Sequence, residues 1–146
     1  MNALANPKTN IHSELSALPD WKKRILIVDD DRDLVATLVF RMQRAGFEVH
    51  AAYDGQAGLA TAYRERPEVV VLDVMMSYQD GFEVCAELKR GKDGYKPKVI
   101  IVSAITQGTN RSEDSCKAES GADAFFSKPF EAKRLIEEIT RLLSTQ

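Results

Sequence analysis

From Arg24 to the end of the chain, short apolar runs alternate with segments in which apolar residues recur every three or four positions. Most of the runs are rich in Val and Ile and have no polar face, which is typical of strands buried on both sides of a parallel sheet. The runs that we expect to form strands are 24–28, 48–52, 69–72, 98–102 and 124–126.

The segments between these runs have the spacing of helices. Leu34, Leu38 and Met42 recur every four residues, and Gly46 is placed to end that helix. The segment 111–120 is a weaker helix candidate because few of its residues are apolar. The other expected helices are 55–66, 82–90 before Gly91, and the segment after Pro129 that Leu135, Ile136, Ile139, Leu142 and Leu143 line.

Strands that alternate with helices predict an α/β fold, in which helices cover both faces of a doubly wound, five-stranded parallel sheet. Such a sheet carries its functional site at the carboxyl ends of the strands, near the point where the strand order reverses. The polar residues that follow the strands are therefore the first candidates for function.

Residues 1–23 are rich in Asn, Ser, Thr and Pro, and we separate them from a single domain over 24–146. Within this segment Ile11, Leu15 and Leu18 recur at helical spacing. Two interpretations stay open: a tail without fixed structure, or a short helix that packs on the domain or on a partner.

Carboxylates, a hydroxyl and an ammonium group follow the expected strands. Carboxylates that lie close together repel one another, so such a cluster needs compensating positive charge. Mg²⁺ prefers carboxylate oxygens, and a lysine would supply a second positive charge. The residues concerned are Asp29 and Asp30 after the first strand, Asp73 after the third, Ser103 after the fourth and Lys128 after the fifth.

Each of these residues also has an ordinary structural interpretation. Asp31, the third acidic residue of its run, is equally consistent with a cap on the following helix. Ser103 alone would be a loop hydroxyl, and Lys128 alone would be a solvated surface charge. Their joint position at the carboxyl ends of separate strands is what points to a site.

Several short motifs occur in order along the chain, and together they resemble the receiver domains of two-component response regulators, the CheY-like superfamily. The resemblance covers about residues 24–143 and implies the flavodoxin-like strand order 2-1-3-4-5 of that family. The motifs are Ile25-Leu-Ile-Val-Asp-Asp-Asp31, Val71-Leu-Asp73-Val-Met-Met76, Asp80-Gly81, Val102-Ser-Ala104, Gly121-Ala-Asp123 and Lys128-Pro-Phe130.

The resemblance implies that Asp73 accepts a phosphoryl group from a histidine kinase. Mg²⁺ would be bound directly by Asp30, largely through water by Asp29, and also by Asp73 and the backbone carbonyl of Met75. Lys128 would offset charge on the phosphoryl oxygens during transfer.

Two residues are implied in a conformational switch. Ser103 would reach the phosphoryl group, and Phe125 occupies the position of the family's rotating aromatic residue. The signal would then leave through the face formed by the fourth helix, the fifth strand and the last helix.

The chain departs from the family pattern in several places. Ser77 stands where Pro is usual, Phe125 lacks the hydroxyl of the common Tyr, and 104–120 is about three residues longer than usual.

Met75 and Ile105 are expected to flank the phosphoryl group. Because both are apolar and cannot orient a water molecule, they predict slow loss of the phosphate.

Composition removes several other classes of protein. A net charge of −2 does not favour nucleic-acid binding, and the apolar runs are far too short to span a membrane. The N-terminus lacks the apolar core of a signal peptide. Cys85 and Cys116 fit no metal or disulfide spacing, so we expect a reducing, cytoplasmic location.

Three functions are compatible with such a chain: a phosphoacceptor switch, a binding module on the same fold that takes no phosphate, and an enzyme with an Asp nucleophile. The full set of site residues disfavours the module, and Met75 replaces the second Asp that such enzymes usually carry. We therefore expect a signalling receiver that is not an enzyme, and that is a monomer or weak dimer before activation. Its partners would be a sensor histidine kinase or phosphotransfer protein, and a downstream protein or an output domain missing from this sequence.

Overall fold

The computed structural model of the chain describes residues 23–76, 79–104 and 120–144, with the backbone alone for residues 79 and 80. Some of the expectations above therefore lie outside the described residues. They concern the N-terminal segment 1–22, Ser77, Ile105 and most of the expected helix 111–120.

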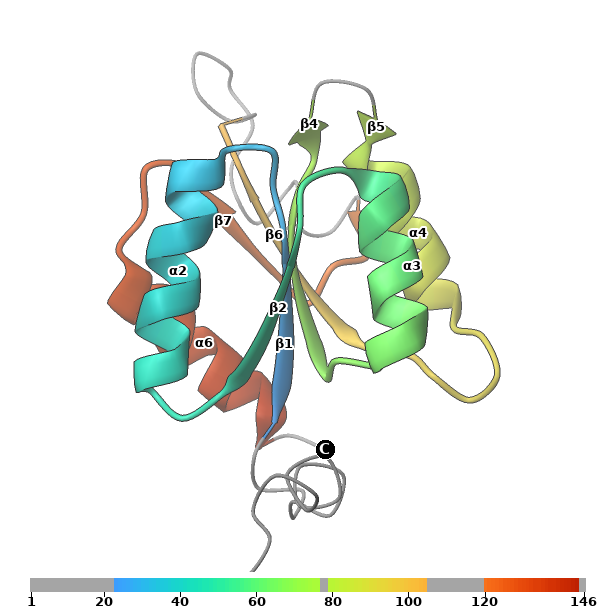
Figure 1. Cartoon of the computed structure of the whole chain (residues 1–146). Coiled ribbons are helices and arrows are strands. Elements are labelled where there is room, and N and C mark those ends of the chain that lie inside the picture. Colours follow the sequence, from blue (N-terminus) through green and yellow to red (C-terminus); the bar gives the residue numbers. More distant parts are fainter. Residues whose placement is uncertain (1–22, 77–78, 105–119, 145–146) are drawn as a thin grey trace, which may run out of the picture.

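A parallel sheet forms the centre of the molecule (Figure 1), and its strands are β1 (Arg24–Val28), β2 (Glu48–Ala52), β3 (Val69–Asp73), β6 (Lys98–Ser103) and β7 (Ala124–Ser127). Their order across this 5-stranded sheet is β2-β1-β3-β6-β7. Counted within this sheet alone, that is the order 2-1-3-4-5, so the predicted fold class is confirmed.

The helices that the structure describes are α2 (Arg32–Arg44), α3 (Gly55–Glu65), α4 (Gly81–Arg90) and α6 (Ala132–Leu143). Two of them, α2 and α6, cover one face of the sheet, and α3 and α4 cover the other (Figure 1). Within the described ranges, no helix has the length and apolar character needed to cross a bilayer.

Alternation along the strands divides the apolar core between the two faces. In β1, Ile25 and Ile27 join the cluster under α2 and α6, whereas Leu26 and Val28 join the cluster under α3 and α4. Every residue from Val69 to Leu72 in β3 is fully buried. Burial of each such side chain contributes about 1.5–3 kcal/mol to the stability of the fold, so the centre of the sheet is strongly stabilised.

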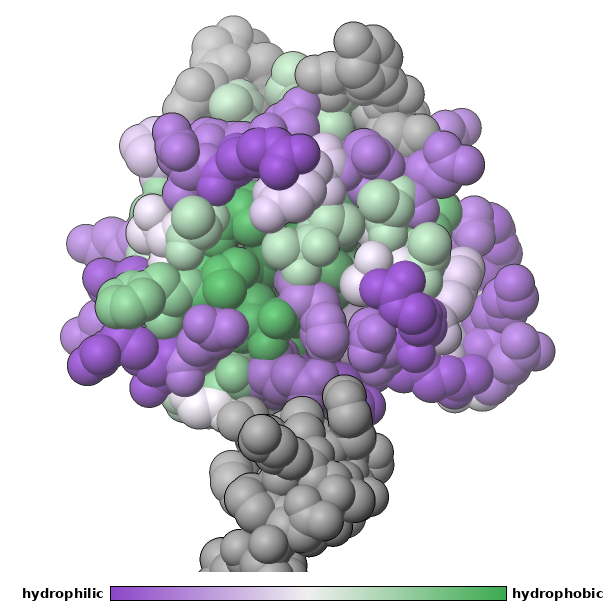
Figure 2. All heavy atoms as spheres, viewed as in Figure 1, coloured by the Kyte–Doolittle hydropathy of each residue, from purple (hydrophilic) through white to green (hydrophobic). Residues whose placement is uncertain are grey.

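The outer strand β2 is less completely covered. Figure 2 shows hydrophobic side chains gathered over α2 and β2 on one face of the molecule, with polar side chains around them. Phe47, Val49 and Ala51 are only partly buried there, and Phe40 on α2 is 60% exposed. The molecule therefore leaves part of its apolar surface open beside this edge strand.

Aspartate side chains cap the N-termini of α2 and α3. Asp31 Oδ1 accepts a hydrogen bond from the Leu34 N–H at 3.1 Å, and Asp54 Oδ1 accepts one from the Ala57 N–H at 2.8 Å. Caps of this kind contribute about 1 kcal/mol each. The capping interpretation of Asp31 is thus confirmed.

A small antiparallel hairpin follows β3 and was not predicted. Its strands are β4 (Met75–Met76) and β5 (Gln79–Asp80), which are too short to show a sequence period. The hairpin leads directly into α4, which begins at Gly81. A Cβ atom at position 81 would lie 2.6 Å from the Asp73 carbonyl oxygen and 2.3 Å from Val74 Cα, so only glycine fits this close approach.

Candidate functional site

Asp29 and Asp73 lie side by side at the carboxyl edge of the sheet. Asp29 directly follows β1, Asp73 ends β3, and the parallel pairing of these two strands brings both residues to the same place. Their exposed fractions are 1% and 3%. Asp30 is exposed but belongs to the same group, because one carboxylate oxygen of each residue lies within 4.8 Å of the others.

Lys128 reaches these carboxylates from the residue that follows β7. Its Nζ atom lies 2.8 Å from Asp29 Oδ2 and 3.3 Å from Asp73 Oδ2. The Lys128 N–H donates a hydrogen bond of 2.9 Å to the carbonyl oxygen of Ser103, the last residue of β6. The structure therefore brings together the acidic residues and the lysine that the sequence placed on separate strands.

Backbone N–H groups hold the remaining oxygens of the two buried carboxylates. The Asp31 N–H donates to Asp29 Oδ1 at 2.9 Å, and the Met75 N–H donates to Asp73 Oδ1 at 2.9 Å. Each carboxylate thus has one oxygen on the backbone and the other beside the Lys128 ammonium group. These hydrogen bonds fix the orientation of both side chains and satisfy groups that would be costly to bury unpaired.

Burial and charge shift the pKa values of Asp29 and Lys128. Burial raises the pKa of Asp29, and the negative charge of Asp73 acts in the same direction, against the hydrogen bond from Lys128. Burial alone would lower the pKa of Lys128, but the hydrogen bond to Asp29 and the charges of both aspartates outweigh it and raise that pKa. The group holds three carboxylates, and the Lys128 ammonium group contacts those of Asp29 and Asp73, so the pocket favours a further cation.

The donor atoms of the pocket fit Mg²⁺ in particular. Side chains of Asp29, Asp30 and Asp73 offer oxygen atoms only, and Mg²⁺ is held in proteins by one or two carboxylates together with water and phosphate oxygens. Exposed Asp30 leaves one side of the group open to water. The backbone carbonyl of Met75 stays a predicted ligand.

Ser103 lies beside the pocket at the end of β6, and Phe125 lies in the apolar core within β7. Ser103 is fully buried at the end of β6, the strand that pairs with β3. Phe125 in β7 is 6% exposed and packs in the apolar cluster on the α3 and α4 side of the sheet. Its ring is therefore in an inward position, and its part in a switch stays a prediction.

An ion pair at the other end of the sheet was missed from the sequence. Lys89 Nζ on α4 lies 2.8 Å from Asp123 Oδ2, and the same oxygen accepts a hydrogen bond of 2.8 Å from the Val99 N–H. The pair ties α4 to the beginning of β6. Asp123 belongs to one of the recognised motifs, but its partner on a distant helix has no signal in the sequence.

Comparison with known proteins identifies one family over most of the chain. The family model described as the response regulator receiver domain matches residues 25–140. The receiver domain of Francisella response regulator 1452 is 27% identical, with a TM-score of 0.71, over 82% of this chain and 95% of that one.

Two further solved structures are similar to the chain. A CheY-like receiver domain protein from Methanospirillum hungatei is 28% identical, with a TM-score of 0.71, over 84% of this chain and 94% of that one. The BeF₃-activated DrrB receiver domain is 28% identical, with a TM-score of 0.69, over 84% of this chain and 97% of that one. Residues 25–140 thus carry both the fold and the sequence pattern of one family, and the chain belongs to the response regulator receiver domains.

Proposed function

We propose that this receiver domain is a phosphoacceptor switch in which Asp73 takes the phosphoryl group. The observation that supports the proposal most is the position of Asp73: nearly buried, oriented by the Met75 N–H, and 3.3 Å from the Lys128 ammonium group. A carboxylate held in this way can act as a nucleophile and form an acyl phosphate. The similar DrrB receiver is described as activated by BeF₃.

The phosphoryl donor in the proposed reaction is a phosphohistidine of a sensor histidine kinase or phosphotransfer protein. A carboxylate oxygen of Asp73 forms the new bond to phosphorus, and the phosphorus–nitrogen bond of the donor breaks. The electron pair of that bond stays on the imidazole nitrogen. The Lys128 ammonium group faces Oδ2 of Asp29 and Oδ2 of Asp73. Its positive charge is therefore placed to offset the negative charge of the incoming phosphoryl oxygens.

Mg²⁺ would be held by Asp29, Asp30 and Asp73, with the Met75 carbonyl as the backbone ligand. The ion supplies charge neutralisation at the phosphoryl oxygens when it is bound. Asp29 contributes by its fixed orientation, because its Oδ1 is engaged by the Asp31 N–H and its Oδ2 by Lys128.

Phosphorylation would change the shape of the domain through Ser103 and Phe125. The Ser103 hydroxyl would turn to a phosphoryl oxygen, and the backbone of Ser103 is already linked to Lys128. Phe125, which is already packed in the apolar cluster, would move further toward the space that this movement leaves. The signal would pass to the face of the helix expected within 111–120, β7 and α6, as a two-state change biased by one local charge.

In this proposal the domain is a signalling component of the cytoplasm and not an enzyme with a separate substrate. It would catalyse only its own phosphorylation and the slow loss of its phosphate. Its output would be a contact with a downstream protein or with an output domain. A location in a reducing compartment agrees with the buried free thiol of Cys85.

The test is phosphorylation by acetyl phosphate with Mg²⁺, followed by intact-mass spectrometry. Wild-type protein should gain one phosphoryl group, and Asp73→Asn should gain none while keeping its circular dichroism spectrum. Asp33→Asn is the matched control, because Asp33 is an exposed aspartate in the first turn of α2. Equal phosphorylation of Asp73→Asn would exclude the assignment, and an unmodified wild type would favour a binding module.

A further inference from the structure

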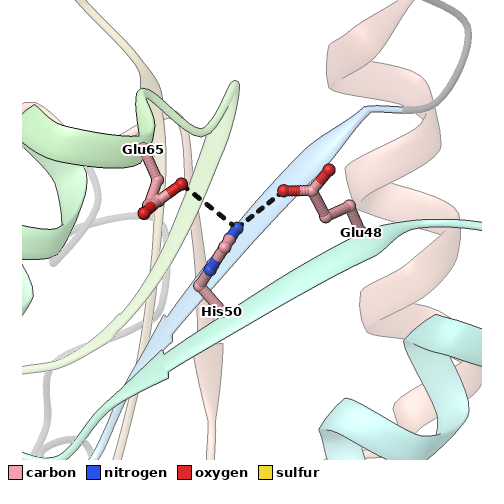
Figure 3. Close-up of side chains that lie close together, drawn as sticks. All are labelled: Glu48, His50 and Glu65. Atoms are coloured by element: carbon pink, nitrogen blue, oxygen red, sulfur yellow. Dashed lines mark hydrogen bonds and ion pairs between the residues drawn. The ribbon is translucent and has the colours of Figure 1, made fainter. Parts of the chain in front are cut away.

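A second group of metal-ligating side chains lies away from the acidic pocket. Glu48 and His50 are two residues apart on β2, so they share one face of that strand, and Glu65 lies in the last turn of α3. Figure 3 shows the three side chains pointing toward one another. His50 Nε2 lies 2.8 Å from Glu48 Oε2 and 3.8 Å from Glu65 Oε1.

Arginines contact both carboxylates, but each through one oxygen only. Arg24 Nε lies 3.2 Å from Glu48 Oε2, and Arg64 Nε lies 2.9 Å from Glu65 Oε2. Among the described residues, no hydrogen bond or ion pair engages Glu48 Oε1, and Glu65 Oε1 faces only the His50 ring. Each carboxylate can therefore keep its arginine and offer its other oxygen to a metal ion.

The backbone of α3 adds negative potential at the same place. Glu65 is the last residue of α3, and Arg66 caps the helix in the left-handed conformation. Carbonyl groups at a helix C-terminus attract cations, and the Arg24 guanidinium already lies 3.5 Å from the Glu65 carbonyl oxygen. The Arg24 contact shows that this helix end accepts a cation independently of the glutamate side chains, and a metal ion would share that potential with Arg24.

We propose that Glu48, His50 and Glu65 form a binding site for a divalent transition-metal ion of the Zn²⁺ class. An imidazole nitrogen with two carboxylate oxygens suits Zn²⁺, Co²⁺ or Ni²⁺ better than Mg²⁺, which prefers oxygen ligands alone. One ligand atom from each residue already lies within 4.8 Å of the others. Ligands of a tetrahedral zinc ion are about 3.4 Å apart, so small side-chain rotations would bring these atoms into place, with water as the fourth ligand. His50 Nε2 would bind the ion in its deprotonated form, so its proton and its hydrogen bond to Glu48 Oε2 would be lost on binding.

The proposed ion would fasten the edge strand to its neighbouring helix. Among the described strands, β2 pairs with β1 alone, and α3 contacts both β1 and β2. A metal bound between Glu65 and the Glu48–His50 pair adds a cross-link between β2 and α3. Because Glu48 pairs with Arg24 at the amino end of β1, the site is separate from the carboxyl edge that holds Asp29 and Asp73.

Calorimetric titration with Zn²⁺ in excess Mg²⁺ tests the proposal on the whole chain. Even changes outside a ligand shell weaken metal binding about 10–100-fold, so His50→Gln and Glu65→Gln should weaken Zn²⁺ binding at least about tenfold. His12→Gln removes the other of the 2 histidines, and Glu137→Gln removes an exposed glutamate of α6. Both control variants should bind Zn²⁺ as the wild type does.

Nuclear magnetic resonance of the wild type gives a readout that does not depend on how well the variants fold. The chain has 2 histidines, so the ring signals of His50 can be assigned with His12→Gln. The His50 ring signals should shift on addition of Zn²⁺ and stay unchanged with Mg²⁺. The proposal is wrong if these signals do not move at saturating Zn²⁺, or if folded His50→Gln binds Zn²⁺ with wild-type affinity.

Discussion

The two ends of the sheet both collect carboxylates around a basic group, but they bury them to different extents. At the carboxyl edge, the Asp29 and Asp73 side chains are 2% and 5% exposed and both face Lys128. Near the amino end, the side chains of Glu48 and Glu65 are 32% and 31% exposed around His50. Water screens the second group, whereas at the first it reaches Asp30 and part of Lys128 but hardly the Asp29 and Asp73 carboxylates.

This difference in burial determines how much each charged group contributes to the free energy of unfolding. Exposed ion pairs contribute about 0–1 kcal/mol, because water and salt compete with them. Buried charges depend on their partners, and removing one partner leaves the others in a medium that cannot solvate them. Single changes at the carboxyl edge should therefore have large effects on stability and function, whereas single changes near the amino end should have small ones.

The largest effect is expected for Lys128→Met. The change leaves Asp29 and Asp73 buried without their ammonium partner, so the free energy of unfolding without Mg²⁺ should fall by roughly 1–3 kcal/mol. Urea denaturation measures it, with exposed Lys133→Met on α6 as the control. Mg²⁺ should recover part of the loss. Equal urea midpoints for both variants would remove the proposed contrast between the two ends.

A second change concerns how long the phosphoryl group persists at the carboxyl edge. The Met75 side chain is 58% exposed two residues after Asp73, and Ile105 lies outside the described residues. Polar residues at both positions can orient water, so Met75→Asn with Ile105→Glu should shorten the phosphoryl lifetime about tenfold, or about 1.4 kcal/mol of barrier. The measurement follows phosphate loss with Mg²⁺ present. An unchanged lifetime would contradict the shielding by apolar side chains.

The pH dependence of stability should separate the two ends further. The raised pKa of Asp29 means that the folded state binds its proton more tightly than the unfolded state does. Stability from this group is present below the unfolded pKa and is lost as pH rises through the folded pKa. Without Mg²⁺, the free energy of unfolding of Asp29→Asn should therefore rise relative to that of the wild type as pH increases across that range. The rise should be about 1.4 kcal/mol per unit of pKa difference. Parallel pH profiles for the two proteins would show that Asp29 is not perturbed.

The smallest effect is expected near the amino end. Glu48→Gln removes the carboxylate that Arg24 and His50 share, but all of these groups reach water. Without added metal, the free energy of unfolding should change by less than about 1 kcal/mol, and the change should shrink at high salt. Denaturation at low and high ionic strength checks this. A loss as large as that of Lys128→Met would mean that exposure does not govern the difference.

The sequence predicted the sheet and its acidic edge for the same physical reason. Valine and isoleucine runs mark strands that are buried on both faces, and parallel strands deliver whatever follows them to one edge. Asp29, Asp73 and Lys128 could therefore be grouped without any knowledge of distances. The observed strands β3 and β6 are each one residue longer than predicted. The added residues, Asp73 and Ser103, are both residues of the candidate site.

Contacts that depend on how a helix sits on the sheet could not be predicted. His50 meets Glu65 only because α3 packs against β2 at one particular rotation, and Lys89 meets Asp123 only because α4 ends near the beginning of β7. The β4–β5 hairpin was missed because two-residue strands have no period. Side-chain periodicity indicates which face of a helix is buried, but it does not fix which residue on the sheet that face meets.

The close approach at Gly81 sets a rule for laboratory evolution of this domain. A Cβ atom there would lie 2.3 Å from Val74 Cα and 2.6 Å from the Asp73 carbonyl oxygen, and backbone atoms cannot move aside as a flexible side chain can. In a library randomised at this codon and selected for phosphorylation, glycine should be the residue that survives. Diversity belongs instead on exposed positions such as Phe40, where no neighbour constrains the choice of side chain so tightly.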